Sequence, residues 1–117
     1  MAIRTFAAID VGSFELEMGI YEMSYKTGIR RVDHIRHVIA LGKDTYSEGK
    51  ISYGLVEEMC QVLGEFVQIM KTYRVKDYRA YATSAMREAR NNQIILEQIR
   101  VRTGLNVRII SNSEQRF

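Results

Sequence analysis

Hydrophobic and polar residues alternate along the first forty positions in a way that predicts three consecutive β-strands. Residues Ile3 to Val11 are apolar with few interruptions, as expected for a mostly buried strand. From residue 14 apolar and polar positions alternate, and the apolar residues that share one face are Phe14, Leu16, Met18 and Ile20. Residues 29–39 continue as a less regular third strand. Because only short turns separate these strands, we expect an antiparallel meander.

The apolar positions change to helical spacing after Ser52. We expect the Ser52 side chain to cap a long helix, because the apolar residues that follow recur at steps of three and four. These residues are Val56, Met59, Cys60, Leu63, Phe66, Val67, Met70 and Tyr73. A close contact between this helix and the sheet would explain Gly64 within it. The preceding segment, Leu41 to Lys50, is polar and punctuated by glycine, which predicts a loop.

The rest of the chain predicts two further strands and two further helices. In chain order these are a strand over residues 78–83, a short helix over 84–90, a helix up to Gly104 and a strand over 107–110. Asn91 or Asn92 is the expected cap of the second helix, and Gly104 is placed to end it. The order is therefore β-β-β-α-β-α-β. Strands joined through a helix pair in parallel, so we expect an α/β fold with a mixed five-stranded sheet and helices packed on it.

The composition is that of one soluble globular domain. The chain has 117 residues, of which 46% are hydrophobic and 26% charged, and this length is enough to bury a core without disulfides. No apolar stretch approaches the roughly 18 residues that a membrane span needs, and the N-terminus lacks the apolar segment of a signal peptide. The single cysteine, Cys60, has no partner. We therefore expect a cytoplasmic protein without a membrane partner.

The charge balance favours an anionic ligand. The chain carries 17 Lys and Arg against 14 Asp and Glu, a formal net charge of +3. This mild excess fits an anion better than a cation. It lacks the basic clustering that is typical of a nucleic-acid-binding surface. We therefore expect no nucleic acid among the partners.

The turn between the first two predicted strands has residues that suit phosphate chemistry. An apolar strand ends at Asp10, and the chain then turns through Gly12 and Ser13. Backbone N–H groups of a glycine turn can bind phosphate oxygens, and a carboxylate can hold a metal-bound water. The same residues also suit an ordinary β-hairpin, in which aspartate and glycine serve only the turn. The turn alone leaves both interpretations open.

Three segments of the chain together resemble one protein family. They are Ala8 to Ser13, Ala82 to Asn91 and Ile109 to Gln115. With these segments in this order and at these spacings, the chain is similar to the N-terminal half of the exopolyphosphatase/guanosine pentaphosphate phosphatase (Ppx/GppA) family. That family belongs to the actin-like, sugar-kinase and Hsp70-like ATPase superfamily, with a ribonuclease-H-like fold. The resemblance implies a phosphohydrolase that cleaves terminal phosphate from inorganic polyphosphate or guanosine pentaphosphate.

The resemblance also implies roles for individual residues. Asp10 would lie beside the phosphate to be cleaved and help to hold a divalent metal, expected to be Mg²⁺, or the attacking water. Phosphate-binding roles would fall to Gly12, Ser13, Thr83, Ser84 and Arg87. Hydroxyls and N–H groups after a strand can bind an anion, and an arginine can do so with two bonds. A helix cap followed by a surface arginine is the alternative interpretation of the later residues.

The third segment departs from the family pattern. The family usually has Ser-Gly-x-Glu-Glu-Ala here, and its second glutamate is the general base that activates water. In this chain Asn112 stands at the glycine position, Glu114 at the first glutamate and Gln115 at the catalytic one. Glutamine has no basic site near neutral pH. Either Glu114 takes over through a shifted loop, or the base comes from elsewhere, or hydrolysis is slow or absent.

Family members continue with a second half that carries another glycine-rich phosphate loop. We therefore expect residues 1–117 to be the N-terminal domain of a longer protein, weak or inactive alone and able to form a homodimer through an unpaired edge strand. Two alternatives to the hydrolase stay open. One is a non-hydrolytic phosphate- or nucleotide-binding regulatory domain, which Gln115 would suit. The other is a relative of sugar or acetate kinases, against which the run Thr83 to Asn91 argues.

Overall fold

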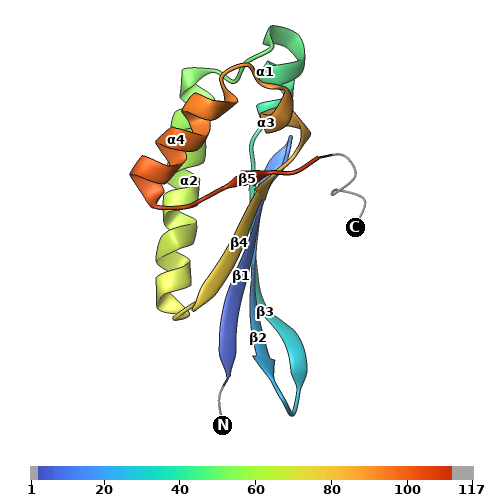
Figure 1. The fold of residues 1–117 in the computed structure, drawn as a ribbon, viewed down its shortest axis with the longest axis vertical. Helices are drawn as coiled ribbons and strands as arrows, with labels where there is room; N and C mark the ends of the chain where they lie inside the picture. The colour runs from blue at the N-terminus through green and yellow to red at the C-terminus, as the bar shows by residue number, and fades with distance from the viewer. Residues whose placement is uncertain (1–2, 112–117) are drawn as a thin grey trace.

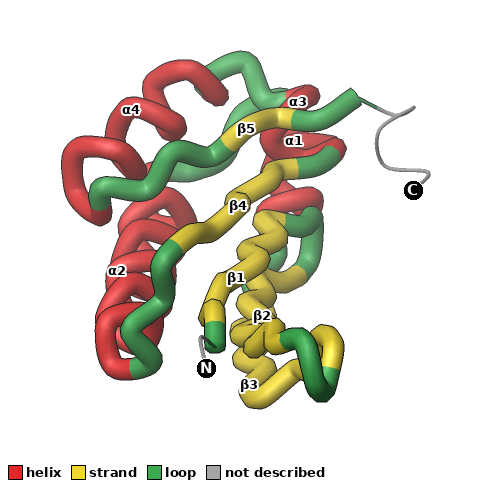
Figure 2. Tube along the Cα trace, turned by 60° about the horizontal axis from the view of Figure 1, so that its bottom comes forward, coloured by secondary structure: helices red, strands yellow, loops and turns green. Residues whose placement is uncertain are grey.

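Residues 3–111, which the computed structural model describes, form one five-stranded sheet with helices on one face (Figure 1). In chain order the elements are β1 (Arg4–Val11), β2 (Glu15–Ser24), β3 (Gly28–Val38), α1 (Leu41–Glu48), α2 (Tyr53–Thr72), β4 (Asp77–Ala82), α3 (Ser84–Glu88), α4 (Asn92–Thr103) and β5 (Arg108–Ile109). Helices α2 and α4 lie beside the sheet, whereas α1 and α3 lie beyond the end toward which β1 runs (Figures 1 and 2). Within residues 3–111 no helix combines the length and the apolar character that a bilayer crossing requires.

The sheet is mixed, as the sequence predicts. Its strand order is β3-β2-β1-β4-β5. The consecutive strands β1, β2 and β3 pair antiparallel. Helices precede both later strands, and here β4 pairs in parallel with β1 and β5 pairs in parallel with β4. β1 is therefore the central strand. The carboxyl ends of β1 and β4 therefore lie side by side, although these two strands are far apart in the sequence.

The alternation along β1 and β2 decides which face of the sheet is covered. Ile9 is paired with Met18 on β2 and with Ala80 on β4, and all three residues are almost fully buried. Leu63 and Phe66 of α2 belong to the same buried cluster. A shift of one residue would move this apolar set to the open face. Burial of the core therefore also fixes which side chains of β1 face away from the helices.

Phe14 does not continue the apolar face of β2 as its spacing predicts. The strand begins one residue later, at Glu15, and 59% of the Phe14 surface is exposed. The Phe14 carbonyl accepts a hydrogen bond from the Ile39 N–H at 3.0 Å, so its backbone joins the turn to the chain after β3. The two-residue period holds only where strand pairing keeps the backbone extended.

The predicted loop at residues 41–50 is instead helix α1, so this prediction was wrong. Tertiary contacts stabilise the helix: Leu41 is fully buried, and the buried Thr45 donates its hydroxyl proton to the Ala85 carbonyl of α3 at 2.9 Å. Gly49, which suggested a loop, ends the helix in the left-handed conformation, with φ at 75°. Its N–H donates to the Thr45 carbonyl at 2.8 Å.

The helix ends follow the sequence in part. Ser52 caps α2 as predicted, since its side chain accepts a backbone hydrogen bond from the first turn at 3.4 Å. Gly104 ends α4 in the left-handed conformation, as predicted. Asn91 holds the cap position of α4, but its side chain makes no capping bond there. It exchanges two hydrogen bonds with the backbone of Ile51 instead, at 3.2 and 2.9 Å.

Gly64 faces a helix rather than the sheet, which corrects the explanation expected for it. A Cβ atom at this position would lie 4.0 Å from the methyl group of Thr103 on α4. That distance is ordinary van der Waals contact, so an alanine would fit. The packing of α2 on α4 therefore does not require a glycine at this position.

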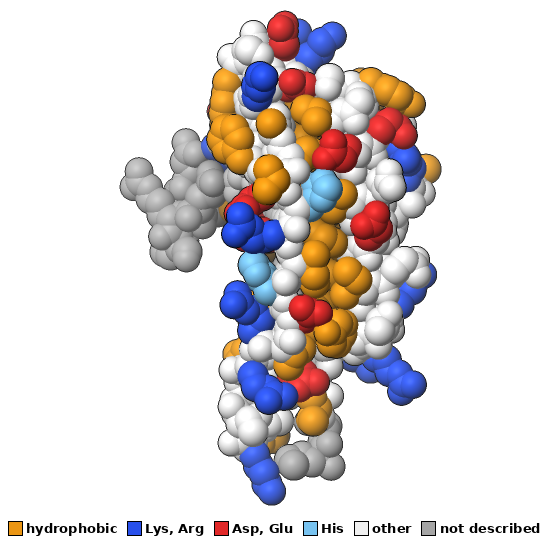
Figure 3. Space-filling model, turned by 180° about the vertical axis from the view of Figure 1, so that it is seen from behind, with side chains coloured by type: hydrophobic (Ala, Val, Ile, Leu, Met, Phe, Trp, Pro, Cys, Tyr) orange, Lys and Arg blue, Asp and Glu red, His pale blue; other side chains and the backbone are white. Residues whose placement is uncertain are grey.

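Apolar side chains at the margin of the core are partly exposed between β3 and α2. Val32 and Ile35 of β3, with Leu55 and Ile69 of α2, are partly buried and pack against the core. From behind, apolar side chains form a band along the molecule, with charged side chains on both sides of it (Figure 3). Among residues 3–111 no strand pairs with the outer edge of β3. The homodimer expected from such an edge stays a prediction.

Replacing Thr45 with valine should destabilise the fold by about 1–3 kcal/mol, because the side-chain shape is kept while the buried Ala85 carbonyl loses its donor. Urea unfolding followed by circular dichroism measures the change. Thr72→Val is the matched control, since the Thr72 hydroxyl donates to the Gln68 carbonyl at 3.2 Å on the exposed side of α2. We expect it to cost less than about 0.5 kcal/mol. Equal losses in the two variants would contradict the importance of the contact between α1 and α3.

Candidate functional site

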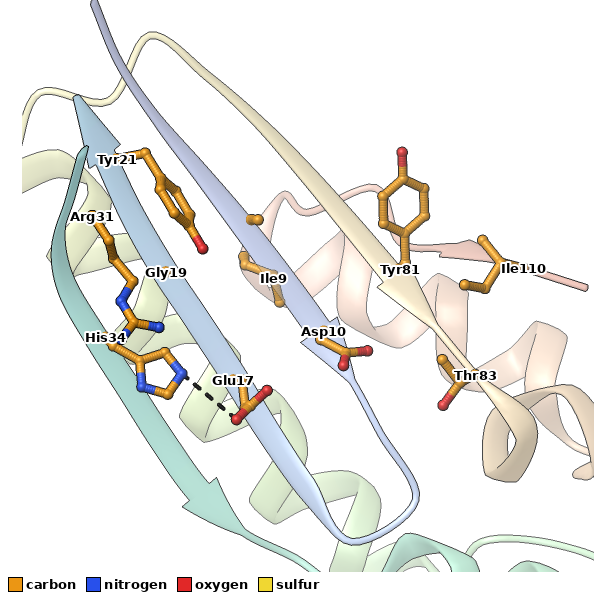
Figure 4. Close-up of a pocket in the computed structure, with 11 residues that line it drawn as sticks. Ile9, Asp10, Glu17, Gly19, Tyr21, Arg31, His34, Tyr81, Thr83 and Ile110 are labelled. Carbon is orange, nitrogen blue, oxygen red and sulfur yellow. Dashed lines mark ion pairs between the residues drawn. The ribbon is translucent and has the colours of Figure 1, made fainter. Parts of the chain in front are cut away.

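A pocket of about 460 Å³ lies on the face of the sheet that α2 and α4 leave open (Figure 4). Asp10, Glu17 and Thr83 line it where β1 and β4 end and β2 begins. Arg31 and His34 of β3 line its other side. Figure 4 shows the two carboxylates and the Thr83 hydroxyl at the same end of neighbouring strands. The pocket therefore brings two of the predicted site residues, Asp10 and Thr83, together.

Strand geometry places Asp10 beside a second carboxylate. Asp10 and Glu17 are direct partners in the antiparallel pairing of β1 with β2. Such partners share a face, with Cβ atoms about 4.5–5.5 Å apart. Ile9 and Val11, on either side of Asp10, are buried beneath the helices. Asp10 consequently faces the pocket.

The surroundings of Asp10 favour its neutral form. Its pKa is raised above the ordinary value, first because partial enclosure removes water from the carboxylate and then because the charges of Glu17 and Glu15 repel its own. The neighbouring strand β3 brings positive or protonatable groups to those two glutamates. Glu15 pairs with Arg36 at 2.8 Å, and Glu17 lies 3.5 Å from His34. A cation beside Asp10 would stabilise its carboxylate form.

The turn after β1 has features of both interpretations of its sequence. The Gly12 N–H donates to the Glu15 carbonyl at 2.9 Å, so the hairpin occupies an N–H that the resemblance assigns to phosphate. A Cβ atom at Gly12 would lie 3.1 Å from the same carbonyl oxygen, and the tightness of the turn explains the glycine. The Ser13 hydroxyl bonds outside the hairpin, to helices that follow much later in the chain.

Three hydroxyls meet beside this turn. The Ser13 Oγ lies 3.1 Å from the Ser84 Oγ, and the Tyr46 hydroxyl lies 2.6 Å from the Ser84 Oγ and 3.4 Å from the Ser13 Oγ. The structure thus joins two predicted site residues that come from the first turn and from α3. Sequence reasoning missed Tyr46, because its segment was predicted as a loop. The available signal, its place one helical turn after Gly42, has meaning only once α1 is known to be a helix.

Thr83 and Arg87 follow β4 in different settings. Thr83 extends the pairing of β4 with β1, since its N–H donates to the Val11 carbonyl at 3.2 Å. Arg87 on α3 donates to the Ile110 carbonyl at 2.6 Å, and 22% of its side chain is exposed. Its guanidinium therefore joins α3 to the chain after β5. An anion would have to share the five N–H donors of this group with that carbonyl.

The predicted catalytic residues Glu114 and Gln115 lie outside the described residues. The described chain reaches Ser111, and Ile110 lines the same pocket as Asp10. The expected roles of Glu114 and Gln115 therefore stay predictions from the sequence.

The donor set near Asp10 fits a metal that needs few protein ligands. Among residues 3–111 no group of three or more His, Cys, Asp or Glu side chains could hold a metal ion. Mg²⁺ is commonly bound through one or two carboxylates, with water and substrate phosphates completing its octahedron. Asp10 and Glu17 supply such a pair of carboxylates. The residues present therefore suit Mg²⁺ held together with a phosphate ligand better than a metal held by protein alone.

Comparison with known proteins decides between the families that the fold allows. The profile of the Ppx/GppA phosphatase family matches residues 20–115, which is most of the chain. The chain belongs to the Ppx/GppA phosphatase family. Both the suspected family and the predicted α/β class of fold are thereby confirmed.

Individual relatives in this family support the same conclusion. Exopolyphosphatase 1 of Mycobacterium leprae is 26% identical over 108 residues, which cover 92% of this chain and 32% of that protein. The crystal structure of the Aquifex aeolicus Ppx/GppA family member is 26% identical with a TM-score of 0.93, covering 97% of this chain and 37% of that one. An exopolyphosphatase structure from Cytophaga hutchinsonii, 21% identical with a TM-score of 0.89, shows the same fold over 94% of this chain and 35% of its own. The chain thus spans about a third of the length of these relatives.

Replacing Asp10 with asparagine should raise the free energy of unfolding at neutral pH. A carboxylate whose pKa is raised by folding binds its proton more tightly in the folded state. Its destabilising effect therefore grows as the pH rises above the ordinary aspartate range and disappears well below it. Urea unfolding should show a more stable variant at about pH 7, and the difference should shrink toward about pH 3.

Asp77→Asn is the matched control for this measurement. Asp77 is exposed at the start of β4, and its carboxylate lies 2.9 Å from the Arg79 guanidinium. Removing that charge should not stabilise the fold. A loss of stability in Asp10→Asn at neutral pH, or an equal gain in both variants, would contradict the electrostatic account of Asp10.

Proposed function

We propose that this chain is the N-terminal, phosphate-binding domain of a phosphohydrolase whose full-length form cleaves terminal phosphate from inorganic polyphosphate. The observation that carries the proposal is the convergence of Asp10, Thr83 and the Ser13–Ser84 hydroxyl pair at the carboxyl ends of β1 and β4. Open α/β sheets bind their ligands at this edge. Membership of the Ppx/GppA phosphatase family supports the same chemistry.

The residue types present match what phosphoryl transfer requires. The reaction depends on positioning and on stabilising charge at the phosphate oxygens, with little covalent work for the protein. The hydroxyls of Ser13, Ser84 and Thr83 would bind and orient the terminal phosphate. Asp10 and Glu17 would hold Mg²⁺, which when bound would neutralise charge on the phosphate oxygens. Arg87 follows Ser84 by three residues, and its side chain is partly exposed. It would share its N–H donors between the ligand and the Ile110 carbonyl.

The names of the relatives support polyphosphate as the substrate. The curated relatives are exopolyphosphatases. Guanosine pentaphosphate, the other substrate that the family resemblance implies, also ends in a phosphoanhydride and is the second candidate. Parallel assays with the two substrates separate them.

A non-hydrolytic phosphate-binding domain is the second candidate function, and one sequence observation favours it. By the family resemblance, Gln115 would stand at the position of the family's catalytic glutamate, and an amide cannot accept the proton of an attacking water as a carboxylate can. Binding of the phosphate would then persist while hydrolysis is lost.

Phosphate release from polyphosphate by the full-length protein tests the hydrolase proposal. We expect release that needs Mg²⁺ and stops when EDTA removes it, because Asp10 and Glu17 are too few ligands to retain the metal alone. Asp10→Asn should lower the rate by about 10²-fold or more. An amide holds the metal less well than a carboxylate, and a reacting group misplaced by about 1 Å can cost that much. Full activity in EDTA would contradict the metal, and an inactive wild type that still binds polyphosphate would favour the second candidate.

Restoring the family's carboxylate should raise the rate if the missing base limits hydrolysis. General-base catalysis contributes about 10²–10⁴-fold, so Gln115→Glu should increase phosphate release within that range. Gln93→Glu adds the same carboxylate at an exposed position of α4 and should leave the rate unchanged. If the wild type is active and Gln115→Glu gains nothing, the base comes from another residue. If both proteins are inactive, the hydrolase proposal is wrong.

A further inference from the structure

We propose that Tyr46 is an additional substrate-binding residue, whose phenolic hydroxyl donates to the terminal phosphoryl group alongside Ser13 and Ser84. This inference rests on the proposed phosphate site. It assigns a role to a residue from α1, a helix that the sequence pattern did not predict. The ligand it addresses is the phosphate end of a phosphoanhydride.

The first observation is the direction of the Tyr46 hydroxyl. It lies 2.6 Å from the Ser84 Oγ and 3.4 Å from the Ser13 Oγ, within a cluster that also joins the two serines at 3.1 Å. Meanwhile 57% of the Tyr46 surface is exposed, so the ring contributes little to the core. An exposed ring whose polar end meets two predicted phosphate ligands is placed for a ligand rather than for packing.

The second observation is that two hydrogen bonds fasten α1 close to Tyr46, from Gly42 one helical turn before it and from the adjacent Thr45. The Gly42 N–H donates to the Ser13 carbonyl at 2.7 Å, and the Thr45 hydroxyl donates to the Ala85 carbonyl at 2.9 Å. One bond holds the helix to the turn that carries Ser13, and the other holds it to the segment that carries Ser84. The backbone that carries Tyr46 is thereby held close to both serines.

The third observation is the space that Gly42 leaves for this ring. A Cβ atom at Gly42 would lie 3.1 Å from the Ser13 Cβ, 3.1 Å from the Tyr46 Cε2 and 3.2 Å from the Phe14 Cζ. These distances are tighter than most real contacts, so a larger residue would push the ring away from the turn. The absence of a side chain at Gly42 therefore allows Tyr46 to approach Ser13.

The chemistry of three clustered hydroxyls suits a phosphate oxygen. Each hydroxyl has one proton to donate, and without a ligand the three can donate only to one another or to water. A phosphate oxygen is a stronger acceptor, because hydrogen bonds to an ionised group are about twice as strong as neutral ones. A phenol O–H is an uncharged donor, so Tyr46 can donate to the phosphate without bringing a charge of its own.

Tyr46→Phe in the full-length protein removes this donor and keeps the ring. We expect KM for polyphosphate to rise about tenfold, the size of one hydrogen bond to a charged group. The kcat should change by less than about twofold, because the bond is made equally in the ground and transition states. The urea midpoint should stay unchanged. Tyr25→Phe is the matched control, since Tyr25 is fully exposed in the β2–β3 turn, at the other end of the strands.

The outcomes separate this inference from the proposed function. If the wild type hydrolyses polyphosphate and Tyr46→Phe behaves as Tyr25→Phe does, the role of Tyr46 is overturned and the hydrolase stands.

If the wild type does not hydrolyse polyphosphate, calorimetric titration with tripolyphosphate tests Tyr46 independently. A Kd about tenfold weaker in Tyr46→Phe supports the inference. An unchanged Kd, or no binding by the wild type, overturns it. A lower urea midpoint with unchanged KM would show a structural role only.

Discussion

The alternation of side chains along β1 is the constraint on which the rest of the structure depends. Ile9 and Val11 are buried beneath the helices, so the residue between them has to face the open side of the sheet. The core thus places Asp10 through the burial of many apolar groups rather than through contacts of the carboxylate itself. Pairing on either side of β1 then brings Glu17 and Thr83 to the same pocket. Packing on one face of the sheet positions the site on the other.

This placement concentrates negative charge, and the edge strand β3 offsets part of it. Glu15 pairs with Arg36 at 2.8 Å, and Glu17 lies 3.5 Å from His34. Both partners belong to β3, which is separated from β1 by β2. Asp10 lies one strand farther from these groups, and its pKa is raised by desolvation and by the two glutamates. A cation bound at Asp10 would therefore stabilise a carboxylate that the strand order places farther from the positive groups of β3 than the two glutamates are.

Local sequence patterns were sufficient for the strands, for α2 and for the residues at the strand ends. They failed for α1, because residues 41–50 lack apolar periodicity and fold as a helix through contacts with Ala85 and with the turn at Ser13. Tyr46 was missed for the same reason. The use of the Gly12 N–H within the hairpin, and of Arg87 on a carbonyl after β5, depends on backbone groups whose positions no side-chain pattern records. Asp10 and Thr83 could be predicted because a motif and a strand end coincide at each.

The sheet order has a consequence for the sequence of events during synthesis. The strands β1, β2 and β3 pair with their neighbours in the chain, so this meander requires only the residues up to Val38. The other edge of β1 waits for β4, which follows two helices, and pairings of such separation form late because a long loop must close first. On the ribosome, Asp10 would therefore be held in a partly formed sheet well before Thr83 emerges. The nascent chain could not capture phosphate between these two residues until β4 had docked.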